Sequence, residues 1–451
     1  MIEKITIHNF KLFSDETFTL NPQFNLIVGV NGSGKSSLLK ALAVSLAGWA
    51  HAYIKSESNL RPIERSEIRE IQRQGRFDLS KETSIEVYGE FPIVDRNLES
   101  KRGYVQWKRF RQEGDTKTYL SGNIRYLNTW SGEYYPTEYN LILSNLGHDV
   151  LKYIESGEQF DLPLIAFYEC DRLWISKNQA NIESAARKQH SRFDPYLDCF
   201  HTGTDSNAIE EWLLKLELSE LQKKNVNPVK KAIEIAAMSA LEDCIGFRFD
   251  LEESRVMVEF KENLTIPFEH LSDGQRTILS LFCDIARRAA ILNPHLDGEA
   301  IKMVEGVVLI DEIDLHLHPK WQRKIVESLR NTFPNIQFVC TTHSPFIIQS
   351  IRSSEEIIMM TGEPLLNYAN KSVEEISKNM GVERPDVSIK YEEMKEIAKS
   401  FMEELEELDC TDREKQEEFK KRLASAVAPY ADNPAYQAFL ELQMLSKFGE
   451  K

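Results

Sequence analysis

The stretch that decides the fold is GVNGSGKS, from Gly29 to Ser36. It fits the pattern GxxxxGK[ST], in which glycines allow backbone N–H groups to surround a chain of phosphates. Lys35 would reach the outer phosphate oxygens, and the Ser36 hydroxyl would bind Mg²⁺. The sequence therefore predicts a nucleotide site. Its binding residues are expected to be Gly29, Asn31, Gly32, Ser33, Gly34, Lys35, Ser36 and Ser37.

The segments on either side of this loop match the strand and the helix that such a loop requires. FNLIV, residues 24–28, is a continuous apolar run that is typical of a buried strand. SSLLKALAVSLAGW, residues 36–49, has the length and composition of a helix whose N-terminus would face the phosphates. The sequence thus predicts an α/β fold of the P-loop NTPase type, with a mixed or parallel sheet.

The composition indicates a globular, cytoplasmic protein. The 451 residues include 55 basic and 71 acidic side chains, and the net charge of −16 argues against broad, charge-driven coating of nucleic acid. No apolar run approaches the roughly 20 residues of a membrane helix, and the start MIEKITIHNF does not resemble a signal peptide. The six cysteines are scattered singly, so neither a disulfide framework nor a zinc site is expected.

Changes of pattern divide the chain into four predicted regions. Residues 1–135 form an N-terminal lobe, with the phosphate loop and an antiparallel β subdomain, and residues 136–245 form a mainly helical insertion. Residues 246–361 begin with a β meander and continue with alternating helices and strands, as a parallel sheet requires. Residues 362–451 form a charged helical C-terminal region.

A pair of acids follows a second apolar strand. VVLIDE, residues 307–312, ends in Asp311 and Glu312, the arrangement that a phosphate-loop enzyme needs on a strand near the loop. Asp311 would hold Mg²⁺ through water, and Glu312 would act as the general base that takes a proton from the attacking water. His343, which follows the apolar run IQFVCTT, would contact the terminal phosphate and, with Glu312 and Lys35, complete the catalytic set.

A second anion site is predicted at LSDGQR, residues 271–276. The Ser272 hydroxyl, the Gly274 backbone and the start of a helix at Gln275 would all direct donors at a phosphate. The stretch resembles the LSGGQ signature of ABC-type ATPases, with Asp273 in place of the usual glycine. Because aspartate is a good N-cap residue, we expect this change to be tolerated.

Two further assignments follow from the resemblance to ABC-type ATPases. Asp314 lies where these proteins carry the acid of the D-loop, the segment after the two catalytic acids. A glutamine that links Mg²⁺ to the helical lobe is expected in REIQRQGRF, residues 69–77, at Gln72 or Gln74. We place it at Gln74, although an ordinary exposed glutamine on a helix explains the residue equally well.

Two other features have simpler alternatives. Four arginines, Arg61, Arg65, Arg69 and Arg73, recur at every fourth residue and would form a basic stripe on a helix, suited to a local DNA contact. A solvated face neutralised by neighbouring glutamates is the alternative. His316 and His318 have no third ligand at suitable spacing, so metal binding is not expected there.

The order of these motifs, with the start IHNFKLF, resembles the branch of ABC ATPases that contains SMC, Rad50, RecF and RecN proteins. The resemblance covers residues 1–48 and 268–352. It implies ATP as the nucleotide and a homodimer or higher homo-oligomer, in which Lys35 of one copy and Ser272 of another hold the same ATP. The stretches DEIDLHLHPKWQ and FYECDRLW are also similar to small bacterial AAA_21-type ATPases, including the Septu defence ATPase PtuA and retron-associated relatives.

This closer similarity implies a partner HNH nuclease, similar to PtuB, that docks on the helical regions and acts against phage. The interval between Lys35 and Ser272 is too short and too broken for a long coiled-coil arm. The C-terminal region lacks the strand-borne acids of the nuclease domain found in OLD-type relatives, so intrinsic nuclease activity is not expected. The alternatives are a RecF-like or Rad50-like DNA repair ATPase that acts directly on DNA and a transporter nucleotide-binding subunit.

Overall fold

The computed structural model describes residues 1–51, 53, 61–73, 75–94, 100–127, 134–136, 143–170, 191–200, 206–225, 227–362 and 368–382, with a few residues between 392 and 425. The chain divides into two compact units, Met1–Met380 and Gly381–Lys451. The predicted helical region 362–451 lies mostly outside the described residues, so the fold below is that of the first unit. Within the described part of the chain, no helix has the length and apolar character needed to cross a membrane.

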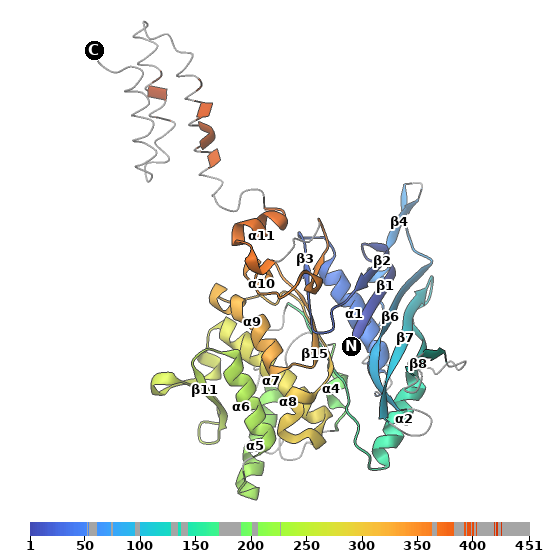
Figure 1. The fold of residues 1–451 in the computed structure, drawn as a ribbon, viewed down its shortest axis with the longest axis vertical. Coiled ribbons are helices and arrows are strands. Elements are labelled where there is room, and N and C mark those ends of the chain that lie inside the picture. Colours follow the sequence, from blue (N-terminus) through green and yellow to red (C-terminus); the bar gives the residue numbers. More distant parts are fainter. Residues whose placement is uncertain are drawn as a thin grey trace. The chain divides into compact units, whose positions relative to one another are not determined.

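A parallel sheet forms the centre of this unit (Figure 1). Its strands lie in the order β10-β14-β15-β3-β16, and all neighbours are parallel. Their bounds are β3 (Phe24–Val28), β10 (Leu164–Tyr168), β14 (Gly306–Ile310), β15 (Ile336–Thr341) and β16 (Ile357–Met359). Every residue of the first four is buried, as expected for strands covered on both faces. The predicted α/β fold is confirmed, and the carboxyl ends of these strands share one edge.

An antiparallel sheet packs beside helix α1 and supplies the second layer (Figure 1). It runs in the order β2-β1-β6-β7-β8-β9. The strands are β1 (Ile2–Phe10), β2 (Phe13–Thr19), β6 (Glu82–Val94), β7 (Ser100–Gln112), β8 (Tyr119–Leu127) and β9 (Tyr134–Pro136). Trp49 of α1 packs on Phe91 and Trp107, with ring centroids 4.4 and 6.1 Å away. The Trp107 indole also donates to the Ser45 carbonyl at 2.8 Å, so α1 is fixed to this sheet as well as to the central one.

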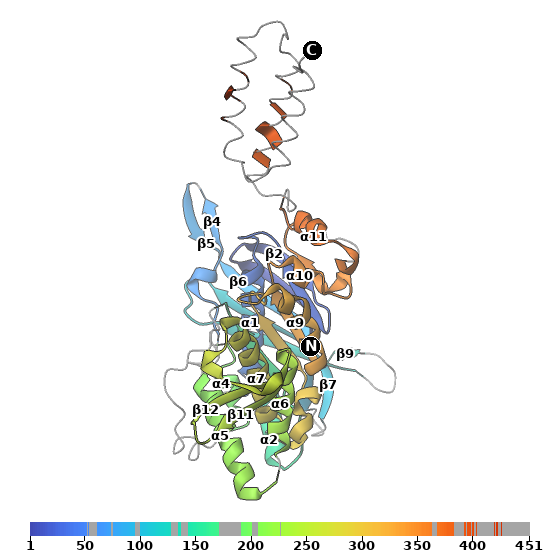
Figure 2. The ribbon, with the colours of Figure 1, turned by 90° about the vertical axis from the view of Figure 1, so that its left-hand side faces the viewer.

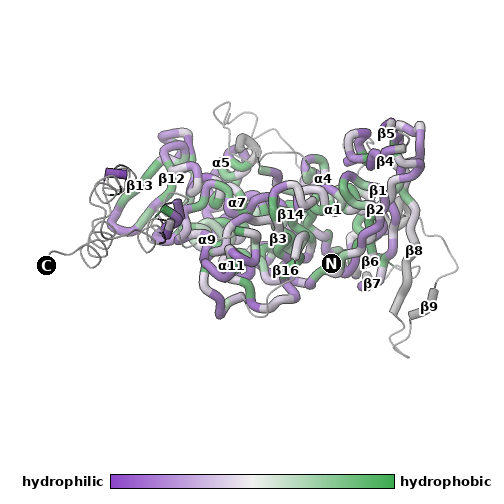
Figure 3. The backbone as a smooth tube through the Cα atoms, turned by 90° about the horizontal axis from the view of Figure 1, so that it is seen from above, coloured by the Kyte–Doolittle hydropathy of each residue, from purple (hydrophilic) through white to green (hydrophobic). Residues whose placement is uncertain are grey.

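Helices cover the central sheet, and Figure 3 shows the apolar strands β3 and β14 between α1 and α7. The longer helices are α1 (Lys35–Ala50), α2 (Leu143–Glu155), α5 (Ser206–Lys223), α6 (Pro228–Ala240), α7 (Asp273–Leu292) and α9 (Pro319–Thr332). The shorter ones are α4 (Asp194–Leu197), α8 (Ala300–Met303), α10 (Pro345–Ile348) and α11 (Val373–Asn379). The predicted meander is a three-stranded sheet of β11 (Cys244–Asp250), β12 (Arg255–Phe260) and β13 (Leu264–Pro267).

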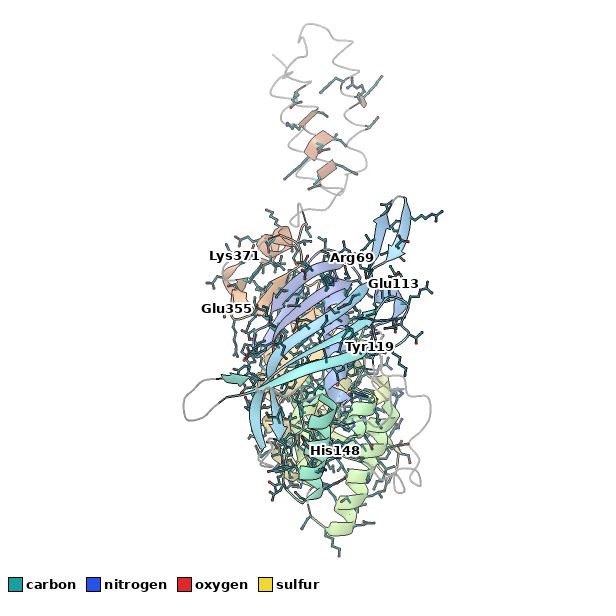
Figure 4. The ribbon with its side chains drawn as sticks, turned by 90° about the vertical axis from the view of Figure 1, so that its right-hand side faces the viewer. Arg69, Glu113, Tyr119, His148, Glu355 and Lys371 are labelled. Atoms are coloured by element: carbon teal, nitrogen blue, oxygen red, sulfur yellow. The ribbon has the colours of Figure 1, made fainter. Side chains whose placement is uncertain are left out.

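The prediction of a helix with a stripe of arginines is wrong. The segment forms a short 3-10 turn followed by a two-stranded ribbon, β4 (Glu70–Arg73) and β5 (Arg76–Leu79), which projects from the antiparallel sheet (Figure 2). Gly75, at φ +80°, allows the tight reversal between the two strands. Arg61 forms an ion pair with Glu67. Arg69, at the base of the ribbon (Figure 4), donates to the Leu12 carbonyl. The segment therefore forms paired strands, although its arginines recur with the spacing of a helix.

Candidate nucleotide site

The phosphate loop, residues 29–36, connects β3 to α1 at the carboxyl edge of the central sheet. Gly34 has φ +104° and begins the helix, a conformation that side chains disfavour. A Cβ at Gly29 would lie 2.7 Å from the Ser33 hydroxyl, so the loop has no room for a side chain there. By contrast, nothing lies within 4 Å of a Cβ placed on Gly32. The loop thus has no space for a side chain at Gly29, where it packs on the protein, but has free space at Gly32, at its tip.

Lys35 is held inside this loop. Its side chain is only 7% exposed, and its ammonium donates to the carbonyls of Gly29 and Val30 at 2.9 and 3.1 Å. Burial lowers the pKa of Lys35, while nearby carboxylates, led by that of Asp311, oppose the change. The ammonium is therefore positioned by the backbone of the loop that it serves.

Asp311, at the end of β14, joins three other segments of the chain. Its Oδ1 accepts hydrogen bonds from the hydroxyls of Thr341, at 2.5 Å, and Ser36, at 3.2 Å. Its Oδ2 accepts from the Cys170 thiol at 3.9 Å. A hydroxyl and a carboxylate are ligands that Mg²⁺ uses in proteins, and here they lie beside the open phosphate loop. The residues therefore fit a nucleotide with Mg²⁺, which Ser36 and Asp311 would hold.

Glu312 has an unusual backbone conformation. Its φ is +49°, which is rare for a residue with a side chain. Its N–H donates to the Thr341 hydroxyl at 2.7 Å, the same hydroxyl that donates to Asp311. Thr341 thus positions both acids. Thr341 has no signal of its own in the sequence, because the run IQFVCTT predicts only a strand that leads to His343.

We expect the Thr341→Val substitution to lower ATP turnover about 10- to 100-fold, because it removes one donor from Asp311 and the acceptor of the Glu312 N–H. Valine keeps the shape of the side chain. Thr332→Val is the matched control, because the Thr332 hydroxyl is also buried but has no hydrogen-bond partner. Steady-state turnover of both variants tests the role of Thr341, and a normal rate for Thr341→Val would contradict it.

The D-loop acid and the predicted phosphate sensor are neighbours. Asp314 Oδ1 accepts from the Thr342 hydroxyl at 2.5 Å and from the backbone N–H of His343 at 3.4 Å. Ser344 then caps α10 and donates from its hydroxyl to Gln322 at 2.7 Å. The backbone around His343 is fixed on both sides, and the His343 residue itself is exposed.

The signature, residues 271–276, caps helix α7. Ser272 and Gln275 form a capping box, in which the Ser272 hydroxyl accepts from the Gln275 N–H at 3.4 Å. A Cβ on Gly274 would lie 2.4 Å from the His316 carbonyl, so only glycine lets the signature pack on the segment after the D-loop. Asp273 forms an ion pair with Arg276, which compensates the charge that replaces the usual glycine. Among the described residues, no hydrogen bond joins the signature to the phosphate loop of the same chain.

The predicted glutamine of the magnesium site, placed at Gln74 with Gln72 as the alternative, stays a prediction. Gln72 is exposed on β4 and lies opposite Phe77, so the expected helix is replaced by a strand. Gln74 lies outside the described residues. His318 caps α9 by accepting from the Lys320 N–H at 3.2 Å, and His316, at φ +62°, lies in the turn before it.

Comparisons with known proteins place the chain in a family. The protein family described as AAA ATPase domain (AAA_15) matches residues 1–348. The retron Vc95 probable ATPase of Vibrio cholerae serotype O1 biovar El Tor is 29% identical over 385 residues, which cover 78% of this chain and 72% of that protein. The Septu protein PtuA of Bacillus thuringiensis is 22% identical over 427 residues, which cover 90% of this chain and 91% of that protein. The predicted relation to PtuA and to retron ATPases is confirmed.

Among solved structures, the SMC head bound to the C-winged helix domain of ScpA is similar to this chain. The match covers 79% of this chain and 94% of that one, with 15% sequence identity and a TM-score of 0.42.

Proposed function

The chain belongs to the AAA ATPase domain family, and on this premise we propose that it binds ATP with Mg²⁺, dimerises head to tail on ATP, and uses hydrolysis to regulate a partner effector. The observation that carries the proposal is the convergence of three segments on one carboxylate. Ser36, Thr341 and Cys170 all donate to Asp311, next to a phosphate loop whose lysine is already positioned.

Each residue of the site has a distinct task in this proposal. Lys35 neutralises the outer phosphates, and Ser36 and Asp311 hold the ion. Bound Mg²⁺ would offset the negative charge that develops on the phosphate oxygens. Glu312, directed by its constrained backbone, accepts the proton from the attacking water. His343, whose backbone N–H donates to Asp314, contacts the terminal phosphate.

The signature supports a site that is shared between two copies. Each chain has two anion-binding elements, the phosphate loop and the N-terminus of α7. A triphosphate bound between two copies would contact the phosphate loop of one copy and the α7 N-terminus of the other. Ser272 is exposed and Gln275 is half-buried at the start of a 20-residue helix. In the dimer, the Ser272 hydroxyl and the Gly274 backbone of one copy would bind the phosphate held by Lys35 of the other.

We expect Ser272→Ala to leave ATP binding intact but to lower turnover about 100-fold, because each site loses a donor supplied by the other copy. The substitution also removes a helix cap, which costs about 1 kcal/mol. Ser372→Ala is the control for that loss, since Ser372 forms the same capping box at the start of α11. Nucleotide binding and turnover are measured for both variants. Normal turnover in Ser272→Ala would contradict the assignment of the signature to the shared site.

The proposed partner is a nuclease of HNH type, similar to PtuB, that docks on helical regions of the chain in defence against phage. The similarity to a Septu protein and to a retron ATPase supports this proposal. The test is to purify the chain with its neighbouring gene products and to assay the complex for DNA cleavage, with and without ATP. A complex that contains no nuclease, or one that ATP does not affect, would contradict it.

A RecF-like or Rad50-like ATPase that contacts DNA itself remains the alternative function. Its main support in the sequence was a helix with four arginines, which the structure replaces by a 3-10 turn and a ribbon. Arg61 and Arg69 of that set are engaged within the chain. DNA-stimulated turnover that falls steeply with salt would favour this alternative.

A further inference from the structure

A buried ionic network lies in the middle of helix α7. Asp284 is 1% exposed and accepts from the guanidinium groups of Arg287 and Arg288, both at 2.7 Å. Arg288 also contacts Asp198 at 2.8 Å and the Pro195 carbonyl at 2.7 Å. None of these groups belongs to the nucleotide site described above.

The network keeps its charges although it is buried. Burial alone would raise the pKa of Asp284, but the guanidinium groups of Arg288 and Arg287 outweigh burial and hold the pKa below its usual range. The third partner of the carboxylate is a phenol. The Tyr168 hydroxyl, on a residue that is 3% exposed, donates to Asp284 Oδ2 at 2.8 Å. Burial, with Asp284 nearby, raises the pKa of Tyr168 well above its usual value, so its hydroxyl remains a donor.

Tyr168 is also bonded to the catalytic strand through its backbone. It is the last residue of β10, and its carbonyl accepts from the N–H of Asp311 at 2.8 Å. Cys170, two positions later, donates its thiol to the Asp311 carboxylate. One residue therefore contacts the signature helix with its side chain and the magnesium-binding acid with its main chain.

The two contacts serve different nucleotides in the proposed dimer. The signature of one chain acts on the ATP held by its partner, whereas Asp311 acts on the ATP held by its own chain. Asp284 lies three turns along α7 from Ser272, about 18 Å along the helix axis. A shift of α7 when the signature engages a phosphate would thus pass through Asp284 and Tyr168 to Asp311.

We infer that Tyr168 is a positioning residue, which couples engagement of the signature in one composite site to the placement of Asp311 in the other. This inference rests on the proposed shared site. The Tyr168 hydroxyl can be removed without leaving Asp284 unpaired, because Asp284 retains both guanidinium partners. The ion pairs would then continue to stabilise the fold, while α7 and β10 would lose the hydrogen bond between them.

The test compares Tyr168→Phe with Tyr196→Phe. Tyr196 is an equally buried tyrosine, 1% exposed, whose hydroxyl donates to the Pro163 carbonyl at 2.6 Å instead of to a residue of α7. Single-turnover hydrolysis should fall about tenfold in Tyr168→Phe and stay within about twofold of wild type in Tyr196→Phe. ATP affinity, measured with Glu312→Gln added to each variant, should be the same in both.

A double-mutant cycle with Ser272→Ala then separates coupling from a general structural effect. If Tyr168 acts through the signature, the double variant Tyr168→Phe, Ser272→Ala should be no slower than Ser272→Ala alone. Two losses that multiply would overturn the inference, as would normal turnover in Tyr168→Phe. Normal turnover in Ser272→Ala is a different outcome, because it would contradict the shared site itself.

Discussion

ATP affinity is expected to fall about 10- to 100-fold when Lys35 is replaced by alanine. The ammonium of Lys35 is buried and held by the carbonyls of Gly29 and Val30, so it meets the phosphates without first having to be ordered. A charge-assisted hydrogen bond contributes about 1.5–3 kcal/mol, which corresponds to this range of dissociation constants. The measurement is the binding of a fluorescent ATP analogue to Lys35→Ala at equilibrium.

Lys40→Ala is the control for this substitution. Lys40 lies on the same helix and forms a looser ion pair with Glu169, at 3.9 Å, so its loss removes a positive charge near the site without touching the loop. We expect its ATP affinity to stay within about twofold of wild type, because a pair of this kind contributes little. Equal affinity in wild type and Lys35→Ala would contradict the assignment of the phosphate loop.

Glu312→Gln is expected to have the largest effect on turnover, a loss of about 100- to 10,000-fold, because glutamine cannot accept the proton of the attacking water. ATP binding should persist, since Lys35, Ser36 and Asp311 are unchanged. The ATP-bound dimer should therefore accumulate, and size-exclusion chromatography with ATP and Mg²⁺ would detect it. The Glu312 N–H bond to Thr341 uses only the backbone, so the substitution should leave the fold intact.

Glu305→Gln is the control for the loss of one negative charge in Glu312→Gln. Glu305 lies just before the opposite end of β14 and forms an ion pair with Arg102, away from the phosphate loop. Its turnover should match wild type. Should Glu312→Gln hydrolyse ATP at the normal rate, another group must act as the base.

The strands and most helices could be predicted because their patterns are strong and local. FNLIV and VVLIDE are continuous apolar runs, and both form fully buried strands of the parallel sheet. The meander at residues 244–267 was also readable, since polar turns separate its alternating strands. The ribbon at residues 70–79 was misread, because a repeat of arginines every four residues has the period of a helix, whereas Gly75 and cross-strand pairing favour a hairpin.

The connections within the site could not be predicted, because they depend on the order of strands that are distant in sequence. Thr341 meets Asp311 only because β15 lies beside β14, and Tyr168 meets Asp311 only because β10 lies on the other side. Motif spacing predicts candidate catalytic residues, but not the residues that hold them in place. The left-handed backbone of Glu312 has no signal in the sequence either, since glutamate rarely adopts it.

The central claim is that each ATP is held by the phosphate loop of one copy and the signature of another. The most direct test mixes Lys35→Ala with Ser272→Ala, two variants that are each expected to be nearly inactive alone. Half of the dimers in an equal mixture contain both chains, and each of these has one site with an intact lysine and an intact serine. Turnover should therefore rise above that of either variant alone, to at most about a quarter of the wild-type rate. No recovery on mixing, with both variants folded, would place the whole site within one chain and contradict the account.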